Sequence, residues 1–265
     1  MLLAIRGALG SSCVHGPAPL NQPNMNNKAN TDRAIPSMEL AQPELWVICA
    51  AYNEAAMIAR VVTDLRQAGH RVVVVDDGSN DGTGLIAAAA GAHVVTHPLN
   101  LGQGAALQTG MDYALSRGAE ILVTFDADGQ HRVADIRRLV DALARERAEF
   151  ALGSRFLGES HDLPRLRRWI LRAATVFTRL TTGLRLTDSH NGLRALTRKG
   201  AAAIQLRQNR MAHASEILAD IARSRLHYVE VPVAIEYTAY SLAKGQRVSD
   251  SVLILLDLLA QELRR

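Results

Sequence analysis

The chain has 265 residues, of which 48% are hydrophobic and 4% aromatic, and a formal net charge of +4. This length and apolar content suffice for one large α/β domain with its own core. The mild basic excess fits a phosphorylated ligand or an anionic membrane surface, whereas the scarcity of aromatic side chains for base stacking argues against a nucleic-acid partner.

Residues 1–42 are rich in Asn, Pro, Ala and Ser without periodicity, and they are predicted to form a disordered or loosely packed tail. The globular domain is predicted to span residues 43–265. Two cysteines, Cys13 and Cys49, follow no disulfide or zinc spacing, so we expect a reducing, cytoplasmic location. No apolar run reaches the length of a transmembrane helix.

The first half of the domain alternates between apolar runs typical of strands and 3.6-residue periodicities typical of helices. Asn53 is expected to cap the first helix and Gly69 to end it. The order predicts an α/β fold with a mostly parallel sheet flanked by helices. The predicted strands are 45–51, 71–75, 93–96, a strand from 121 that ends at Asp126, and 150–153; the predicted helices are 55–68, 84–90, 100–117 and 133–146.

The second half departs from this alternation. Pro232 favours an edge position for its strand. The final helix is too short to span a bilayer once Asp257 is counted, and we interpret it either as a core or dimer helix or as an interfacial helix on anionic lipid. The predicted elements are a basic helix at 164–182, a polar loop at 188–194, helices at 199–206 and 213–223, a strand at 226–236, a polar loop at 237–247 and an apolar helix at 248–263.

Polar and acidic residues follow three of the predicted strands, as Tyr52-Asn53-Glu54, Asp76-Asp77-Gly78-Ser79 and Asp126-Ala127-Asp128. The carboxyl ends of parallel strands are where ligands bind in open α/β sheets. An Asp-x-Asp pair supplies two hard oxygen ligands, which suit Mg²⁺ or Mn²⁺ shared with substrate phosphates. Each signature alone is more often a turn, but the three together predict a metal and phosphate site.

In order and spacing these signatures resemble glycosyltransferase family 2, which has the GT-A fold. Within it, the chain is most similar to the polyprenyl-phosphate glycosyltransferases of the dolichyl-phosphate mannose synthase type, over roughly Leu45 to Arg247. The resemblance implies a metal-dependent, inverting transfer of a hexose from a nucleotide diphosphate sugar, of the GDP-mannose or UDP-glucose type, to a polyprenyl phosphate. The enzyme would reach the inner face of the membrane peripherally or through a membrane-protein partner, and a homo-oligomer stays open.

The resemblance also implies roles for single residues. Asp188 is implied either to act as a base or only to orient its loop. Ala50 stands where the family usually has Pro, and Thr238 where it has Arg. The implied donor-site residues are Ala50, Tyr52, Glu54, Val75, Asp77, Ala127, Asp128, Gln130, Arg155 and Lys244; the implied metal ligands are Asp126, Asp128 and Gln130; and the implied catalytic residues are Asp188, Arg155 and Arg194.

Two other functions stay open at this point. One is a family 2 transferase that acts on a saccharide or small-molecule hydroxyl and needs Asp188 as a true base. The other is a non-catalytic subunit that binds nucleotide sugars. A phosphate acceptor needs little deprotonation near neutral pH, and no second acidic residue accompanies Asp188, so the sequence favours a lipid phosphate. The histidines at 131, 190 and 213 lack metal-ligand spacing and are interpreted as polar loop residues.

Overall fold

Seven strands form one sheet in the computed structural model, which describes residues 43–158, 165–207 and 212–236. The strand order is β3-β2-β1-β4-β6-β5-β7, and β6 is antiparallel to both of its neighbours while the other pairs are parallel. The predicted α/β class with a mostly parallel sheet is therefore confirmed. The strands are β1 (Leu45–Ala51), β2 (Arg71–Asp76), β3 (His93–Thr96), β4 (Ile121–Thr124), β5 (Phe150–Ser154), β6 (Arg194–Thr197) and β7 (Tyr228–Pro232).

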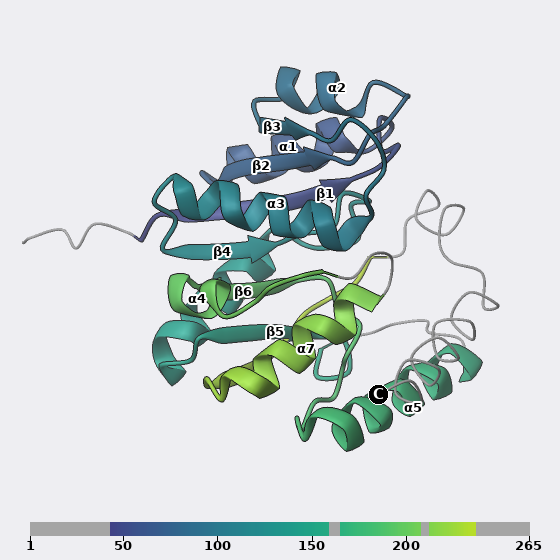
Figure 1. The fold of residues 1–265 in the computed structure, drawn as a ribbon, viewed down its shortest axis with the longest axis vertical. Coiled ribbons are helices and arrows are strands. Elements are labelled where there is room, and N and C mark those ends of the chain that lie inside the picture. The colour runs from purple at the N-terminus through teal and green to yellow at the C-terminus, as the bar shows by residue number, and fades with distance from the viewer. Residues whose placement is uncertain (1–42, 159–164, 208–211, 237–265) are drawn as a thin grey trace, which may run out of the picture. The chain divides into compact units, whose positions relative to one another are not determined.

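Helices cover both faces of the sheet, as Figure 1 shows. Side chains of α1, α2 and α4 pack on one face in one apolar cluster, and side chains of α3, α6 and α7 pack on the other. The helices are α1 (Ile58–Gln67), α2 (Thr83–Ala89), α3 (Gln103–Ser116), α4 (Ala134–Glu146), α5 (Arg165–Thr182), α6 (Arg198–Ala202) and α7 (Ala212–Ser224).

Helix α1 illustrates how the sequence builds this layer. Its buried residues Ile58, Val61, Val62 and Leu65 recur at helical spacing, so they form one apolar face against the sheet. Burial of each such side chain contributes about 1.5–3 kcal/mol. Gly69 ends the helix as predicted: its φ is +85°, and the N–H groups of residues 69 and 70 bond back to carbonyls of the last turn.

The second half of the chain holds most of the errors in the predicted elements. Strand β6 was not predicted: its first residue, Arg194, was placed in the polar loop, and its other residues were assigned to no element. The helix expected at 199–206 is only the short α6. The strand expected at 226–236 is β7, and Pro232 ends it at the edge of the sheet as predicted. Asn53 does not cap α1, because Met57 occupies the N-cap position and Asn53 has a φ of +53°.

The topology brings the ends of β1, β2 and β4 to one edge. The chain runs from β1 outward through β2 and β3, and then returns to β4 on the other side of β1. All four strands are parallel, so the loops after β1 and β4 flank the point at which the strand order reverses. Ligands of open α/β sheets bind in the crevice at such a point.

Several predicted features lie outside the described residues: the N-terminal tail, the loop that contains Lys244, and the apolar helix at 248–263. Within the part of the chain that the structure describes, no helix combines the length and the apolar character that crossing a membrane requires.

Candidate functional site at the carboxyl edge of the sheet

The loops after β1 and β2, residues 52–55 and 77–83, are joined to each other and are called here the β1–β2 loop pair. Backbone N–H groups donate to side-chain oxygens of the other loop, so both loops are fixed by local polar contacts. The bonds run from Asn53 N to Ser79 Oγ (2.9 Å), Glu54 N to Thr83 Oγ1 (2.8 Å), Ala55 N to Asp81 Oδ2 (3.0 Å) and Asn80 N to Asn53 Oδ1 (3.1 Å).

Asp77 is buried beneath this pair, with 3% of its surface exposed. Its carboxylate accepts hydrogen bonds from the backbone N–H of Leu101 (2.9 Å) and of Gly102 (2.7 Å). His97 Nδ1 lies 2.7 Å from Asp77 Oδ1, and His97 Nε2 lies 3.0 Å from Thr109 Oγ1. Asp77 thus fixes the entry into α3, and its implied contact with a nucleotide base stays a prediction.

The other residues implied for the nucleotide pocket differ in exposure. Tyr52 is 44% exposed at the end of β1, whereas Val75 is fully buried in the core and Ala127 is 4% exposed. Ala50 pairs with Val75 in the sheet and is half-buried, as is Glu54. Tyr52 is therefore the most exposed of these five residues, and the role of the set stays a prediction.

Asp126 and Asp128 follow β4 in one loop. Burial is the main cause that raises the pKa of Asp128 to about 6, and the neighbouring charge of Asp126 raises it further. Burial would also raise the pKa of Asp126, but the charge of and hydrogen bond from His131 outweigh it, and the pKa of Asp126 is lowered. His131 Nε2 lies 2.8 Å from Asp126 Oδ2. The site thus holds two neighbouring carboxylates whose pKa values are shifted in opposite directions.

A divalent cation fits these residues. Carboxylate oxygens are hard ligands of the kind that Mg²⁺ and Mn²⁺ prefer, and a cation would relieve the repulsion that raises the pKa of Asp128. Gln130 donates its backbone N–H to Asp128 Oδ1 (3.1 Å), which places its side chain in the same loop. Within residues 43–158, 165–207 and 212–236, no three His, Cys, Asp or Glu side chains gather closely enough to hold a metal by themselves.

Residues 187–192, called here the 187–192 loop, lie directly against this pair. Thr124 at the end of β4 donates its hydroxyl to the carbonyl of Gly192 (2.6 Å). A Cβ atom at Gly192 would lie 2.4–2.7 Å from the carboxylate atoms of Asp126, which is closer than atoms can approach. Glycine is therefore required there, and the loop backbone touches a predicted metal ligand.

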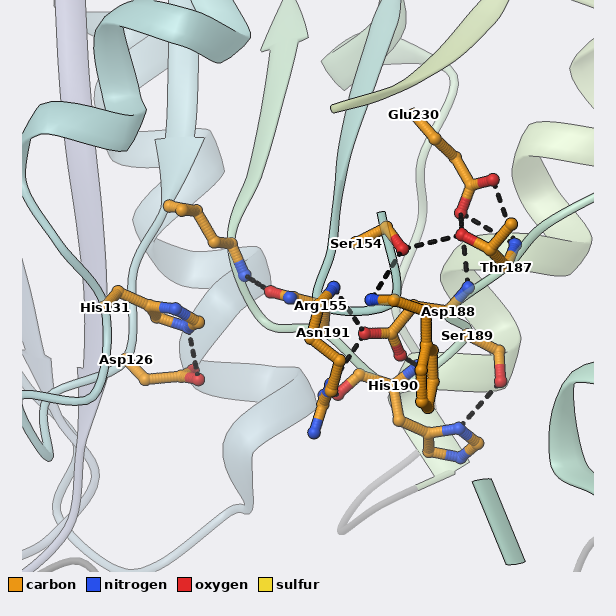
Figure 2. Close-up of polar contacts among 12 residues, drawn as sticks. Asp126, His131, Ser154, Arg155, Thr187, Asp188, Ser189, His190, Asn191 and Glu230 are labelled. Atoms are coloured by element: carbon orange, nitrogen blue, oxygen red, sulfur yellow. Dashed lines mark hydrogen bonds and ion pairs between the residues drawn. The ribbon is translucent and has the colours of Figure 1, made fainter. Parts of the chain in front are cut away.

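A buried ion pair anchors this loop to the end of β5 (Figure 2). Arg155 Nε donates to Asp188 Oδ2 (2.6 Å), and a terminal guanidinium nitrogen of Arg155 donates to the carbonyl of His190 (2.9 Å). The side chains are 9% and 1% exposed. Beside them, the hydroxyls of Ser154 and Thr187 lie 2.6 Å apart. The structure thus brings Arg155 and Asp188 together, and the contacts it shows for them are with each other and with the loop; their implied catalytic roles stay predictions.

Arg194, the first residue of β6, is 4% exposed between β4 and β5. Burial lowers the pKa of its guanidinium, while the charges of Asp126 and Asp188 oppose that shift. Arg194 therefore provides a buried positive charge between the carboxylate pair and the 187–192 loop. Its implied contact with an acceptor phosphate stays a prediction.

Sequence reasoning missed two side chains at this edge, His131 and Asn191. His131 holds Asp126, and the signal was its position in the same loop as Asp126. Asn191 accepts from the backbone N–H of Leu193 (2.9 Å). In the described part of the chain, His131 Nδ1 and Asn191 Nδ2 are two of three buried side-chain atoms without a hydrogen-bond partner, Trp46 Nε1 being the third. Both atoms are therefore buried polar groups without a partner at the edge of the sheet where the carboxylate pair lies.

The chain after β7 returns to the carboxylate loop. His131 and Ile235 form an antiparallel bridge, and Glu236 donates its backbone N–H to the carbonyl of Gln130 (2.9 Å). Arg132 Nε also donates to the carboxylate of Glu236 (2.6 Å). The described chain thus ends beside the predicted metal loop at Glu236, eight residues before Lys244.

Comparisons with known proteins agree with this arrangement. Over residues 46–204 the chain matches the family model described as Glycosyl transferase family 2. It is 32% identical over 231 residues to the UDP-N-acetylglucosamine–dolichyl-phosphate N-acetylglucosaminyltransferase of Methanococcus voltae, covering 79% of this chain and 92% of that protein. It is 35% identical over 170 residues to the polyprenol monophosphomannose synthase of Mycolicibacterium smegmatis, covering 60% of this chain and 64% of that protein.

A solved structure shares the fold. Glucosyl-3-phosphoglycerate synthase of Mycobacterium tuberculosis, in complex with Mn²⁺, uridine diphosphate and phosphoglyceric acid, superposes with a TM-score of 0.60 at 21% identity, covering 83% of this chain and 78% of that one. The predicted GT-A arrangement of the sheet is therefore confirmed. Since the family model spans more than half of its length, the chain belongs to glycosyltransferase family 2.

Proposed function

We propose that the protein transfers a hexose from a nucleotide diphosphate sugar to a polyprenyl phosphate with the help of Mg²⁺ or Mn²⁺. The observation that carries this proposal is the contact between the 187–192 loop and the carboxylate of Asp126 at Gly192. The 187–192 loop, which we propose to lie near the acceptor, contacts Asp126, which we propose to bind the metal of the donor. Such contact supports transfer between two substrates that meet at this edge.

The chain's own residues prepare the donor side. His131 orients Asp126 and lowers its pKa, while burial and the charge of Asp126 raise the pKa of Asp128, a shift that a bound cation would relieve. When bound, the cation would stabilise, as a Lewis acid, the negative charge on the leaving nucleoside diphosphate. Direct transfer to the acceptor in line with the leaving group would invert the anomeric carbon, as we expected from the sequence.

The environment of Asp188 favours a phosphate acceptor over a hydroxyl acceptor. A hydroxyl needs a general base within reach, but the carboxylate of Asp188 is paired with Arg155 and only 1% exposed. An ionised phosphate needs no such base, and the buried guanidinium of Arg194 supplies positive charge nearby. This geometry supports an orienting role for Asp188, and it weakens the alternative of a saccharide or small-molecule acceptor.

The names of the relatives support a lipid phosphate acceptor but differ in the sugar, which is N-acetylglucosamine for one and mannose for the other. We therefore propose a single class of acceptor, a polyprenyl phosphate. For the donor we propose only a nucleotide diphosphate sugar of the GDP-mannose or UDP-glucose type. A polyprenyl phosphate resides in a bilayer, so we also propose that the protein works in peripheral contact with the inner face of a membrane.

Thermal unfolding with GDP, UDP and their sugars, each with and without Mn²⁺, tests the donor site. A ligand that binds only the folded protein stabilises it by about 2.7 kcal/mol at a hundredfold excess over its dissociation constant. We expect one base to stabilise the protein in a metal-dependent manner, and we expect Asp128→Asn to abolish that effect. Asp141→Asn on α4, an exposed carboxylate paired with Arg137, serves as the matched control.

Transfer of labelled hexose to a polyprenyl phosphate in detergent then tests catalysis. Metal-dependent nucleotide binding without transfer to any lipid phosphate would favour the alternative of a nucleotide-sugar-binding subunit. Transfer to a saccharide but not to a lipid phosphate would favour the hydroxyl alternative. No stabilisation by any nucleotide would contradict the donor site itself.

A further inference from the structure

Helix α5 presents an apolar stripe on its outer face. Trp169 is 69% exposed, Val176 is 58% exposed and Leu180 is 79% exposed. Their separations of seven and four residues place all three on one side of the helix. These side chains, called here the α5 stripe, are among the most exposed large apolar residues in the described part of the chain.

The opposite side of α5 faces the protein. Ala174 and Thr178 are buried, with 7% and 6% exposed, and they lie half a turn away from the α5 stripe. Helix α5 packs beside α7, as Figure 1 shows. The helix therefore already buries one face in the fold, and the α5 stripe on its other face stays largely exposed.

The charge of α5 complements an anionic surface. Its sequence contains five arginines and no acidic residue. Arg172 and Arg179 are exposed, and each follows a stripe residue by three positions, so both lie along one border of the stripe. A helix with a tryptophan and aliphatic residues on one side and arginines beside them is typical of helices that lie in the headgroup region of a bilayer.

We propose that the α5 stripe, bordered by Arg172 and Arg179, docks the protein on an anionic lipid bilayer. The inference deepens the proposed function, on which it rests for the location of the acceptor. The apolar side chains enter the headgroup and acyl boundary, and the guanidinium groups contact lipid phosphates. A second copy of the chain and a free polyanion are the competing occupants of this face.

The chain that contains α5 connects the proposed docking surface to the candidate site. The segment that contains α5 leaves β5 at Arg155 and returns at Asp188, and these two residues form the buried ion pair. The adjacent hydroxyls of Ser154 and Thr187 lie 2.6 Å apart. A bilayer bound at α5 is therefore attached through a closed loop of chain to the residues that lead to Gly192 and Asp126.

Tryptophan fluorescence tests this proposal directly. The chain has two tryptophans, and Trp46 is 2% exposed in the core, so a change on adding vesicles reports on Trp169. We expect a blue shift and co-sedimentation with vesicles of equal parts phosphatidylglycerol and phosphatidylcholine, and at least tenfold weaker binding to pure phosphatidylcholine. The double substitution Val176→Asp and Leu180→Asp should weaken binding to the anionic vesicles at least tenfold.

Two further variants sharpen the result. Replacement of Arg172 or Arg179 by Gln should weaken binding about fivefold each and reduce its salt dependence. Leu85→Asp on α2 is the matched control, because Leu85 is 81% exposed and lies outside the stripe. It should bind vesicles like the unchanged protein. Equal unfolding temperatures establish that the variants are folded.

Three outcomes would overturn the proposal: no vesicle binding by the unchanged chain, equal binding by the stripe variant, or a dimer in sedimentation that the stripe variant dissociates while vesicles remain unbound. Binding to inorganic polyphosphate without binding to vesicles would also overturn it. Metal-dependent stabilisation by UDP or GDP is measured on the same variants. Absence of that stabilisation in the unchanged protein and in all variants, while the unchanged protein still binds vesicles and the stripe variant does not, contradicts the proposed function and leaves the docking surface standing.

Discussion

The β1–β2 loop pair and the 187–192 loop meet at the same edge of the sheet but are held by different interactions. The first is fixed by several hydrogen bonds from backbone N–H groups to side-chain oxygens, spread over both loops. The second also has hydrogen bonds, to Glu230, Ser154 and Thr124, but it contains in addition a buried ion pair between Arg155 and Asp188. Loss of one bond among several costs little, whereas loss of one partner of a buried pair strands a charge. The two loops should therefore respond very differently to substitution.

The largest effect is expected for Asp188→Ala. It leaves the guanidinium of Arg155 buried without its carboxylate, so the free energy of unfolding should fall by about 3–5 kcal/mol in urea titrations. The double variant Arg155→Met and Asp188→Leu should recover most of that loss, because no charge is then left buried. A loss below about 1 kcal/mol in the single variant would show that the pair is solvated in solution.

Acid should weaken the 187–192 loop through His190. Burial lowers the pKa of His190 to about 4, with Arg155 and Arg194 reinforcing the shift and Asp188 opposing it. In the unfolded chain the pKa of His190 is about 6.5, so between that value and about 4 the unfolded state binds a proton that the folded state does not bind. The contribution of His190 to stability is therefore fully present above about 6.5 and is lost as the pH falls toward 4.

The loss from this one group is at most about 3 kcal/mol over that window. Urea titrations between these pH values measure it as a difference between the unchanged protein and His190→Gln, which lacks the titrating group. Parallel pH dependences for the two proteins would rule out His190 as the source.

Gly192→Ala tests the contact between the two regions. The added methyl group would collide with the carboxylate of Asp126, so we expect about 1–3 kcal/mol of destabilisation and loss of metal-dependent nucleotide binding. Gly118→Ala is the control, because Gly118 has a φ of +88° and open space around it. It should cost about 1 kcal/mol from backbone strain while leaving nucleotide binding unchanged.

The smallest effect is expected for Asp77→Asn beneath the β1–β2 loop pair. The N–H groups of Leu101 and Gly102 donate to different oxygens of Asp77, and the amide retains only one acceptor oxygen, so one of the two bonds is lost and the cost should be about 1–2 kcal/mol. Asp112→Asn on the exposed face of α3 should change stability by less than about 0.5 kcal/mol. If Asp77→Asn destabilised the protein as much as Asp188→Ala, the contrast between the two loops would not hold.

The same contrast explains what the sequence could predict. The loops after β1, β2 and β4 follow apolar, β-branched runs, and their polar residues are local in sequence, so their gathering at one edge followed from a parallel sheet alone. The sequence did not reveal which of these carboxylates accept hydrogen bonds within the protein. Asp77, for example, accepts from the backbone N–H groups of residues 24 and 25 positions later in the chain.

The second half was less predictable because two of its features, β6 and the pair between Arg155 and Asp188, carry no sequence pattern of their own. Strand β6 has four residues, too few for a periodic pattern, and it is defined by antiparallel pairing with β4 and β5. The pair between Arg155 and Asp188 joins positions 33 residues apart across α5. Both residues were assigned to the site from the resemblance, but their mutual contact has no signature in the sequence.

The closed connection between Arg155 and Asp188 has a consequence for how relatives of this enzyme diverge. The segment between them begins and ends at one point of the fold, so its length and composition can change without displacing β5 or β6. Grafting such a segment from one relative into another should preserve the sheet and the carboxylate pair. Evolution could thereby exchange the surface proposed to meet the acceptor while conserving the residues proposed to handle the donor.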